Sequence, residues 1–183
     1  MTTGFNLAQL NIGRTLFPLD DPRMAGFVER LAEINALAEG SPGYVWRLQG
    51  ESGDATGFKV FDGDPLVIVN LTVWESADEL FEFSYRTAHV EILRGRRSWF
   101  EAWSGPYLVL WWIPAGSIPD VPEALARLER LAADGPTPEA FTLKIRFPSP
   151  DTTLNQAAEH PRETPSDPRP PPAPPSSAPP RMP

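Results

Sequence analysis

Two stretches of the sequence predict β-strands that are apolar on both faces. In residues 66–74, one face carries four branched aliphatic side chains and the other carries Leu66, Ile68, Asn70, Thr72 and Trp74. Residues 107–113 read YLVLWWI and are apolar on both faces as well. An exposed apolar area of this extent is rarely left in water, so both faces of the sheet need cover. This requirement constrains the fold more than any other feature of the chain.

The order of the expected elements is that of a ferredoxin-like α+β fold. They are strand 5–12, helix 20–40, strand 43–49, strand 66–74, helix 76–103 with a bend at Gly95, strand 107–113, helix 120–135 and strand 141–147. The first six follow one another as βαββαβ, the ferredoxin-like order. The seventh and eighth, a helix and an edge strand, are additions to it.

A homodimer would satisfy the need for cover on the second face. The helices of a ferredoxin-like fold cover only one face of the antiparallel sheet, and the other face of a monomer is normally polar. Here it is apolar, so we expect a second copy of the chain to pack against it face to face. The two sheets would then form a dimeric α/β barrel.

The composition changes near Pro148. The last 36 of the 183 residues contain 13 of the 23 prolines. We therefore expect one globular domain at 1–147 and a disordered, proline-rich tail at 148–183. The chain has no cysteine, which excludes disulfides and thiolate metal sites.

Charge and hydropathy exclude two classes of partner. The formal net charge of −8 would repel a phosphate backbone, so we expect no nucleic-acid partner. No stretch approaches 18 uncharged apolar residues, and the amino terminus does not resemble a signal peptide. We expect no membrane association and a cytoplasmic location.

His89 is the only histidine outside the tail and is the first catalytic candidate. Tyr85 and Arg86 lie four and three residues before it, so all three can border one patch of a helix. A neutral imidazole beside an apolar pocket can act as a base or bind haem iron. The alternative is a buried histidine with a purely structural hydrogen bond. One histidine cannot form a conventional multi-histidine site, so we expect no metal centre.

Polar residues within the apolar strands indicate a cavity. Asn70 and Thr72 need hydrogen-bond partners if they are buried among apolar neighbours. With Trp74, Trp112 and Asn11 they are our candidates for binding a small apolar or aromatic molecule. Gln9 and Arg47 would join them if their strands face the same way. The alternative for the aromatic residues is ordinary core packing.

Several motifs resemble known families. Val73-Trp74-Glu75-Ser76, leading from a strand into a helix with a histidine, resembles the dimeric α/β-barrel superfamily of antibiotic-biosynthesis and haem-degrading monooxygenases. Residues 6–147 resemble more closely the uncharacterised bacterial family called domain of unknown function 3291. The motifs that carry this resemblance are YRTAH at 85–89, LRGRRSWF at 93–100, PYLVLWWIPAG at 106–116 and GPTPEAF at 135–141.

The superfamily resemblance implies an oxygenase-type enzyme that uses no cofactor or haem. Haem-degrading members use a strand Asn, a helix Trp and a helix His. Asn6 or Asn11 could supply the first and His89 the last, whereas Phe83 stands at the Trp position. The competing interpretation is a non-catalytic ligand-binding or regulatory module, or a haem-binding protein.

Overall fold

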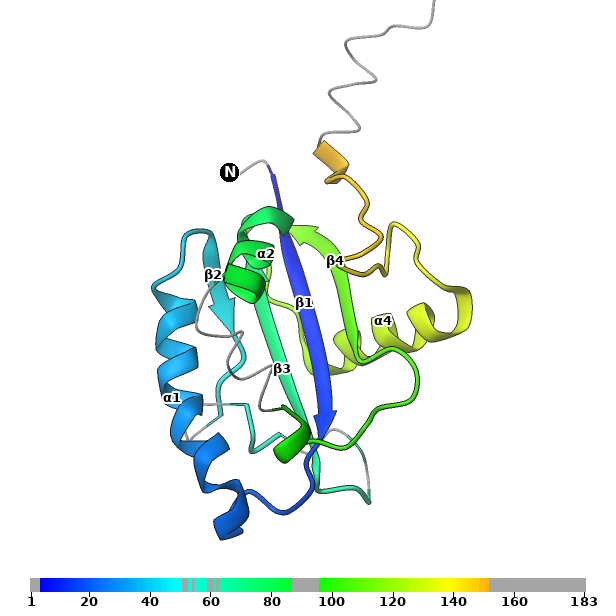
Figure 1. The fold of residues 1–183 in the computed structure, drawn as a ribbon. Coiled ribbons are helices and arrows are strands. Elements are labelled where there is room, and N and C mark those ends of the chain that lie inside the picture. Colours follow the sequence, from blue (N-terminus) through cyan, green and yellow to red (C-terminus); the bar gives the residue numbers. More distant parts are fainter. Residues whose placement is uncertain are drawn as a thin grey trace, which may run out of the picture.

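The computed structural model describes residues 4–50, 53, 55–58, 61, 63–86 and 96–151, without the side chains of residues 86 and 96. Its elements are β1 (Phe5–Arg14), η1 (Pro22–Met24), α1 (Ala25–Glu39), β2 (Tyr44–Arg47), β3 (Val67–Trp74), α2 (Ala77–Arg86), η2 (Arg96–Ser98), β4 (Leu108–Pro114) and α4 (Val121–Asp134). The four strands form one antiparallel sheet in the order β2-β3-β1-β4 (Figure 1). This order, with α1 and α2 as the crossovers, is the ferredoxin-like α+β arrangement and confirms the predicted fold class.

Capping residues fix the helix ends that the sequence predicts. The Asp21 carboxylate accepts a hydrogen bond from the Arg23 amide at 2.9 Å, and Asp120 accepts one from Glu123 at 2.8 Å. Each satisfies an amide that has no partner within its own helix. Gly135 ends α4 with a φ of 74°, a conformation that glycine adopts without strain.

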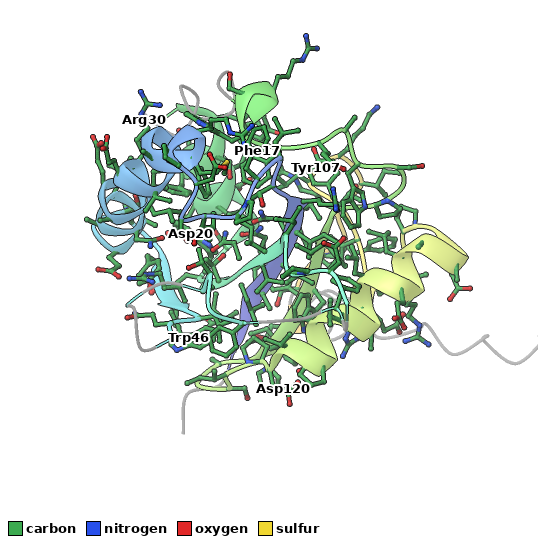
Figure 2. The ribbon with its side chains drawn as sticks, turned by 90° about the horizontal axis from the view of Figure 1, so that it is seen from below. Phe17, Asp20, Arg30, Trp46, Tyr107 and Asp120 are labelled. Carbon is green, nitrogen blue, oxygen red and sulfur yellow. The ribbon has the colours of Figure 1, made fainter. Side chains whose placement is uncertain are left out.

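One face of the sheet is covered from within the chain, by α4 at β1 and β4 and by Leu48, Ala55 and Phe58 of the segment after β2. The buried side chains of this layer are Ala124, Leu128 and Leu131 of α4 and Ala8, Leu10, Ile12, Val69, Leu71, Val73, Val109, Trp111 and Ile113 of the strands. From below, α1 and α4 lie on opposite sides of the sheet (Figure 2). The appended helix and this segment therefore supply the cover that we expected from a second subunit. The exposed apolar face that motivated the homodimer is therefore absent from the described residues. The homodimer stays a prediction, which sedimentation at micromolar concentration would test.

The opposite face of the sheet lies toward α1 and α2. It carries the odd-numbered residues of β1 and the even-numbered residues of β3 and β4, because successive side chains of a strand point to opposite faces. α1 does not pack closely along its whole length on this face. Phe27 and Ala38 are buried, but Leu31 and Ile34 between them are only half-buried. Space is therefore left between the helix and the sheet.

The predicted edge strand at 141–147 is wrong. Phe141 pairs with Leu110 through two backbone hydrogen bonds of 2.8 Å, but this is an isolated bridge. The chain then turns, with the Thr142 amide donating to the Ile145 carbonyl and the Ile145 amide to Thr142 Oγ1. Three of the alternating apolar residues, Phe141, Leu143 and Phe147, pack instead in a cluster, with the ring centroids of Phe141 and Phe147 5.8 Å apart, whereas Ile145 is exposed.

The predicted helix at 96–103 is also wrong beyond its first turn. Only Arg96–Ser98 is helical, as a 3-10 turn. The Trp99 carbonyl then accepts from Leu16 and the Glu101 amide donates to Arg14, so Phe100 forms a bridge with the residue after β1. Backbone groups held in this bridge are not available for a helix.

Candidate functional site

A cavity of about 300 Å³ lies between the sheet and helices α1 and α2. The sheet contributes a polar row from β1, β2 and β3, consisting of Gln9, Asn11, Arg47, Asn70 and Thr72. The helices contribute mainly apolar side chains, namely Phe27, Leu31, Ile34, Ala38, Leu80 and Phe83. An enclosure of this size with an apolar lining and a few converging polar groups is typical of a small-molecule site.

The polar row is a chain of hydrogen bonds. The Trp74 indole N–H donates to Thr72 Oγ1 at 2.9 Å, and the Thr72 hydroxyl donates to Gln9 Oε1 at 2.8 Å. Gln9 Nε2 in turn donates to Asn11 Oδ1 at 2.7 Å, and Asn70 Nδ2 donates to the same oxygen at 2.9 Å. The register of the sheet makes this possible, because Gln9 lies opposite Thr72 and Asn11 opposite Asn70.

The indole at one end sets the direction of this chain. An indole nitrogen can only donate, so the Thr72 oxygen must accept from Trp74. Thr72 is 4% exposed, and its single proton finds an acceptor in Gln9. Reversing the Gln9 amide would leave that proton unpaired in a buried place, at a cost of about 1–3 kcal/mol. The Gln9 amide nitrogen therefore points at Asn11.

Asn11 and Asn70 present opposite groups at the open end of the row. Because Asn11 Oδ1 is occupied by two donors, its amide N–H groups are left for the cavity. The Asn70 amide nitrogen donates to Asn11, so the Asn70 carbonyl oxygen is left to accept a hydrogen bond from a ligand. Within the described part of the chain neither group has a hydrogen-bond partner, and Asn70 is exposed.

Trp74 is a lining residue of the cavity with no exposed surface of its own. Its ring stacks on Phe83 with centroids 5.1 Å apart and receives the edge of Tyr44 at 5.7 Å. The indole is fully buried, and its two ring contacts and its hydrogen bond hold it in one orientation. It acts as a fixed wall for a ligand.

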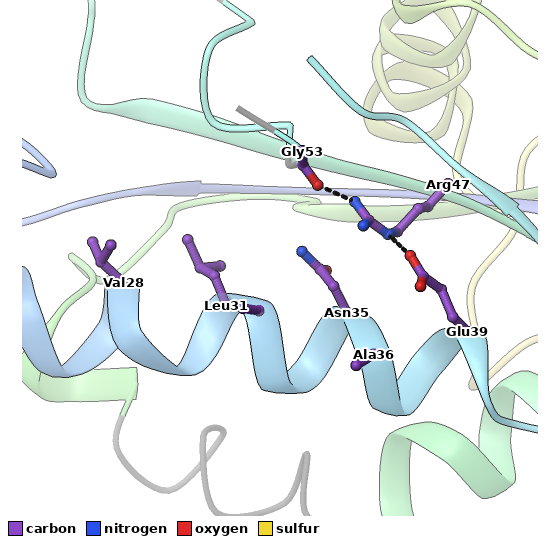
Figure 3. Close-up of a pocket in the computed structure, with 8 residues that line it drawn as sticks. Val28, Leu31, Asn35, Ala36, Glu39, Arg47 and Gly53 are labelled. Carbon is purple, nitrogen blue, oxygen red and sulfur yellow. Dashed lines mark hydrogen bonds and ion pairs between the residues drawn. The ribbon is translucent and has the colours of Figure 1, made fainter. Parts of the chain in front are cut away.

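Arg47 borders both this cavity and a smaller neighbouring pocket of about 230 Å³ between α1 and β2. Its Nε donates to Glu39 Oε1 at 2.7 Å and its Nη1 to the Gly53 carbonyl at 2.9 Å (Figure 3). The side chain is 10% exposed, so these two acceptors balance a guanidinium that is largely removed from water. Asn35 of α1 lines both spaces and extends toward the same region in Figure 3.

The other predicted site residues are placed differently. Tyr85 lines the cavity, but its side chain is 51% exposed and packs on Phe81 with centroids 4.5 Å apart. Trp112 packs on Phe141, and its indole N–H donates to the Phe147 carbonyl at 3.0 Å, away from the cavity lining. His89 and the Arg86 side chain lie outside the described residues.

Of the two strand asparagines, only Asn11 reaches the cavity. Asn6 shares the α4 side of β1 with Ala8 and Leu10, because side chains alternate along a strand. The described lining residues of a type that can bind haem iron are Tyr85 and Tyr107, both partly exposed. These residues do not make a histidine-based haem site. The described residues also contain no group of three His, Cys, Asp or Glu side chains placed to hold a metal ion.

Several lining residues are not apparent as site residues in the sequence. Leu108 begins β4 and Tyr107 precedes it, Leu143 follows α4, and Ser84 lies in α2. The apolar face of α1 is evident from helical spacing, but that spacing predicts packing on the sheet and not a gap above it. Asn35 is the one available signal, as a polar residue next to this apolar face.

The fold resembles solved structures at low identity. An uncharacterised protein of Nitrosomonas europaea, NE2512, is 13% identical with a TM-score of 0.45, over 65% of this chain and 99% of that one. PA3566 from Pseudomonas aeruginosa is 12% identical with a TM-score of 0.38, over 64% and 98%. A second N. europaea protein, provisionally named an antibiotic biosynthesis monooxygenase, is 13% identical with a TM-score of 0.37, over 64% and 94%. At such identities the likeness says nothing about activity.

Three further findings concern the class of protein. No curated protein matches the chain. Among its described helices, none has the length and apolar character needed to cross a membrane. The family model of DUF3291, a domain of unknown function, matches residues 6–157, ten residues beyond the domain end that the composition suggested. The chain belongs to the DUF3291 family.

Proposed function

We propose that this chain binds a small, flat, mainly apolar molecule in the cavity between the sheet and helices α1 and α2. The observation that carries the proposal is the lining itself, in which apolar side chains of two helices face a hydrogen-bonded polar row on the sheet. A volume of about 300 Å³ suits a bicyclic or small tricyclic ring system.

The partial burial of α1 supports a cavity that a ligand completes. Leu31 and Ile34 lie between buried Phe27 and Ala38 but are only half-buried themselves. A ligand that covers them removes further apolar area from water, at about 25 cal/mol per Å². Binding should therefore stabilise the folded chain.

The test is binding of naphthalene, observed by saturation-transfer NMR on the full chain. We expect contact between the ligand and the protein in the wild type and its loss in Ser84→Trp, because residue 84 lines the cavity. Glu129→Trp is the matched control, since Glu129 is exposed on α4 across the sheet. Equal signals in both variants would contradict the proposal.

The bound molecule is a substrate in one version of this proposal and a regulatory ligand in the other. The resemblance to antibiotic-biosynthesis monooxygenases supports the first, in which an aromatic substrate reacts with O₂. For 1-naphthol as the probe, O₂ would supply one oxygen atom to carbon 4, and the quinone and one water would be released. Oxygen uptake and quinone absorbance measure this directly.

The described lining favours the regulatory version. It contains no His, Asp or Glu side chain, the usual general acids and bases. If 1-naphthol consumes oxygen equally fast with and without the protein, the chain is a binding module and not an oxygenase for this probe. A shift of the haemin Soret band on addition of the protein, altered by His89→Ala, would instead support haem binding. A homodimer in the cytoplasm remains the expected setting for either version.

A further inference from the structure

We infer that the cavity selects a neutral, planar ligand that carries an N–H donor beside a carbonyl acceptor, such as a lactam fused to an aromatic ring. This inference rests on the proposed function and adds the chemistry of the ligand's polar edge. It is carried by Asn11 and Asn70, which lie directly opposite each other on β1 and β3.

The hydrogen-bond chain fixes what these two residues offer. Trp74 and Thr72 orient the Gln9 amide, and Gln9 directs its nitrogen at Asn11 Oδ1. Asn70 Nδ2 donates to the same oxygen. Asn11 can therefore only donate to a ligand, through its N–H groups, and Asn70 can accept from a ligand through its carbonyl oxygen. The cavity therefore has a donor on Asn11 and an acceptor on Asn70, two residues that are opposite each other in the sheet, and buried Gln9 fixes the orientation of the Asn11 amide.

This pairing disfavours three other kinds of ligand edge, which should bind more weakly than a lactam. A carboxylate has only acceptors and would face the Asn70 oxygen, whereas an ammonium has only donors and would face the Asn11 amide. A plain hydrocarbon would displace water from both groups without replacing its hydrogen bonds. A cis-lactam satisfies both at once, because its carbonyl accepts from Asn11 and its N–H donates to Asn70.

The apolar surroundings define the body of the ligand. On the sheet, the amide pair lies between Trp74 and Ile68, with Phe100 over neighbouring Gly13. Leu108 lies beside the pair on β4, opposite Asn11 in the register. A fused aromatic ring fits beside a polar edge in such a setting, because rings offer large apolar area with little conformational freedom.

The experiment compares three ligands of similar size by calorimetry on the full chain. They are 2-quinolone, N-methyl-2-quinolone, which lacks the donor, and naphthalene, which lacks both polar groups. We expect 2-quinolone to bind about fivefold more tightly than its N-methyl form, the ratio that one hydrogen bond of average net strength gives when its acceptor, Asn70, is exposed. Naphthalene, which has neither polar group, measures binding by the apolar lining alone.

Asn70→Leu separates hydrogen bonding from shape. Without the Asn70 carbonyl, the two quinolones should bind with affinities within about twofold of each other, whereas Asn35→Leu, at another asparagine of the same lining, should keep the gap. A gap that persists in Asn70→Leu would reflect the bulk of the methyl group and overturn the inference. Equal binding of all three ligands to the wild type would overturn it and leave the binding function standing. Binding of none would remove both.

Discussion

The Trp74 indole and the Thr72 hydroxyl are two residues apart on β3 and are joined by a 2.9 Å hydrogen bond along one face of the strand. Their spacing is the period of a strand, so both side chains point at the same helices. This contact joins the aromatic wall of the cavity to the polar row. Through it, a core residue determines which group each asparagine shows to a ligand.

Thr72→Val should destabilise the protein. Valine matches threonine in shape but leaves the Trp74 N–H and the Gln9 carbonyl without their partner in a site that is 4% exposed. We expect a loss of about 1–3 kcal/mol in the free energy of unfolding, measured by urea denaturation. Thr72→Ser keeps the hydroxyl and should recover most of the loss from the broken hydrogen bonds. Equal losses in the two variants would show that the methyl group, not the hydroxyl, matters at this position.

Two fully buried tryptophans should respond differently to the same replacement. Trp74 donates to Thr72, whereas the Trp111 Nε1 has no hydrogen-bond partner among the described residues. Trp74→Phe and Trp111→Phe remove the same volume, but only the first leaves an acceptor unpaired. We expect Trp74→Phe to be more destabilising by about 1–2 kcal/mol in thermal or urea unfolding. The reverse order would place the partner of Trp111 outside the described contacts.

Gly43→Ala should be strongly destabilising for two separable reasons. Gly43 has a φ of 73°, which disfavours any residue with a Cβ, and a Cβ there would collide with the Glu79 carboxylate. The second contact would displace Glu79 from Ser76 Oγ at the start of α2. Gly116→Ala is the control, because its φ is 85° but nothing lies within 4 Å of the added atom.

We expect Gly116→Ala to cost about 1 kcal/mol, from the backbone alone, and Gly43→Ala at least about twice that. The comparison of their unfolding midpoints measures what the Glu79 contact adds. If the two variants lose the same free energy of unfolding, the Glu79 side chain moves aside without cost, and the start of α2 tolerates the loss of its contact with Ser76.

Asp21 should make stability depend on pH in the acidic range. Its hydrogen bonds with Arg23 lower the pKa of the carboxyl from 3.8 to about 2. A carboxyl with a lowered pKa stabilises the fold above its ordinary pKa, and this contribution disappears as the pH falls through the folded value. The stability difference between wild type and Asp21→Asn should therefore be constant above about pH 5 and shrink toward pH 2.

The measurement is thermal unfolding of both proteins at pH 7, 5, 3 and 2. Asp20→Asn, which removes the same charge one residue earlier on an exposed side chain, controls for net charge. A difference between wild type and Asp21→Asn that does not change with pH would mean that Arg23 does not hold the carboxylate in solution.

Local chemistry was the part of the fold that could be predicted. Asp21, Asp120 and Gly135 fix helix ends by contacts within three or four residues, and such signals are legible in a sequence. The apolar alternation at 141–147 was misleading, because an alternating pattern does not by itself determine backbone pairing, and one of its members, Ile145, is exposed. Phe141 and Phe147 are packed in a cluster instead.

The site was predictable in its residue types but not in its connections. Asn70 and Thr72 stand out as polar residues in an apolar strand, and a search for their partners leads to a cavity. Their partners Asn11 and Gln9 are 59 and 63 residues away, and only the register of β1 on β3 brings them together. The role of α4 as the second layer depends in the same way on long-range packing.

The sheet separates two requirements that often conflict in a binding protein. On the α4 side, residues such as Leu71 and Trp111 are fully buried in close packing, and a change there is felt by the whole domain. On the side of α1 and α2, Asn70 and its neighbours border open space. Alternate positions of one strand therefore have different physical constraints, so a substitution on the cavity side can change the ligand preference without disturbing the packed framework.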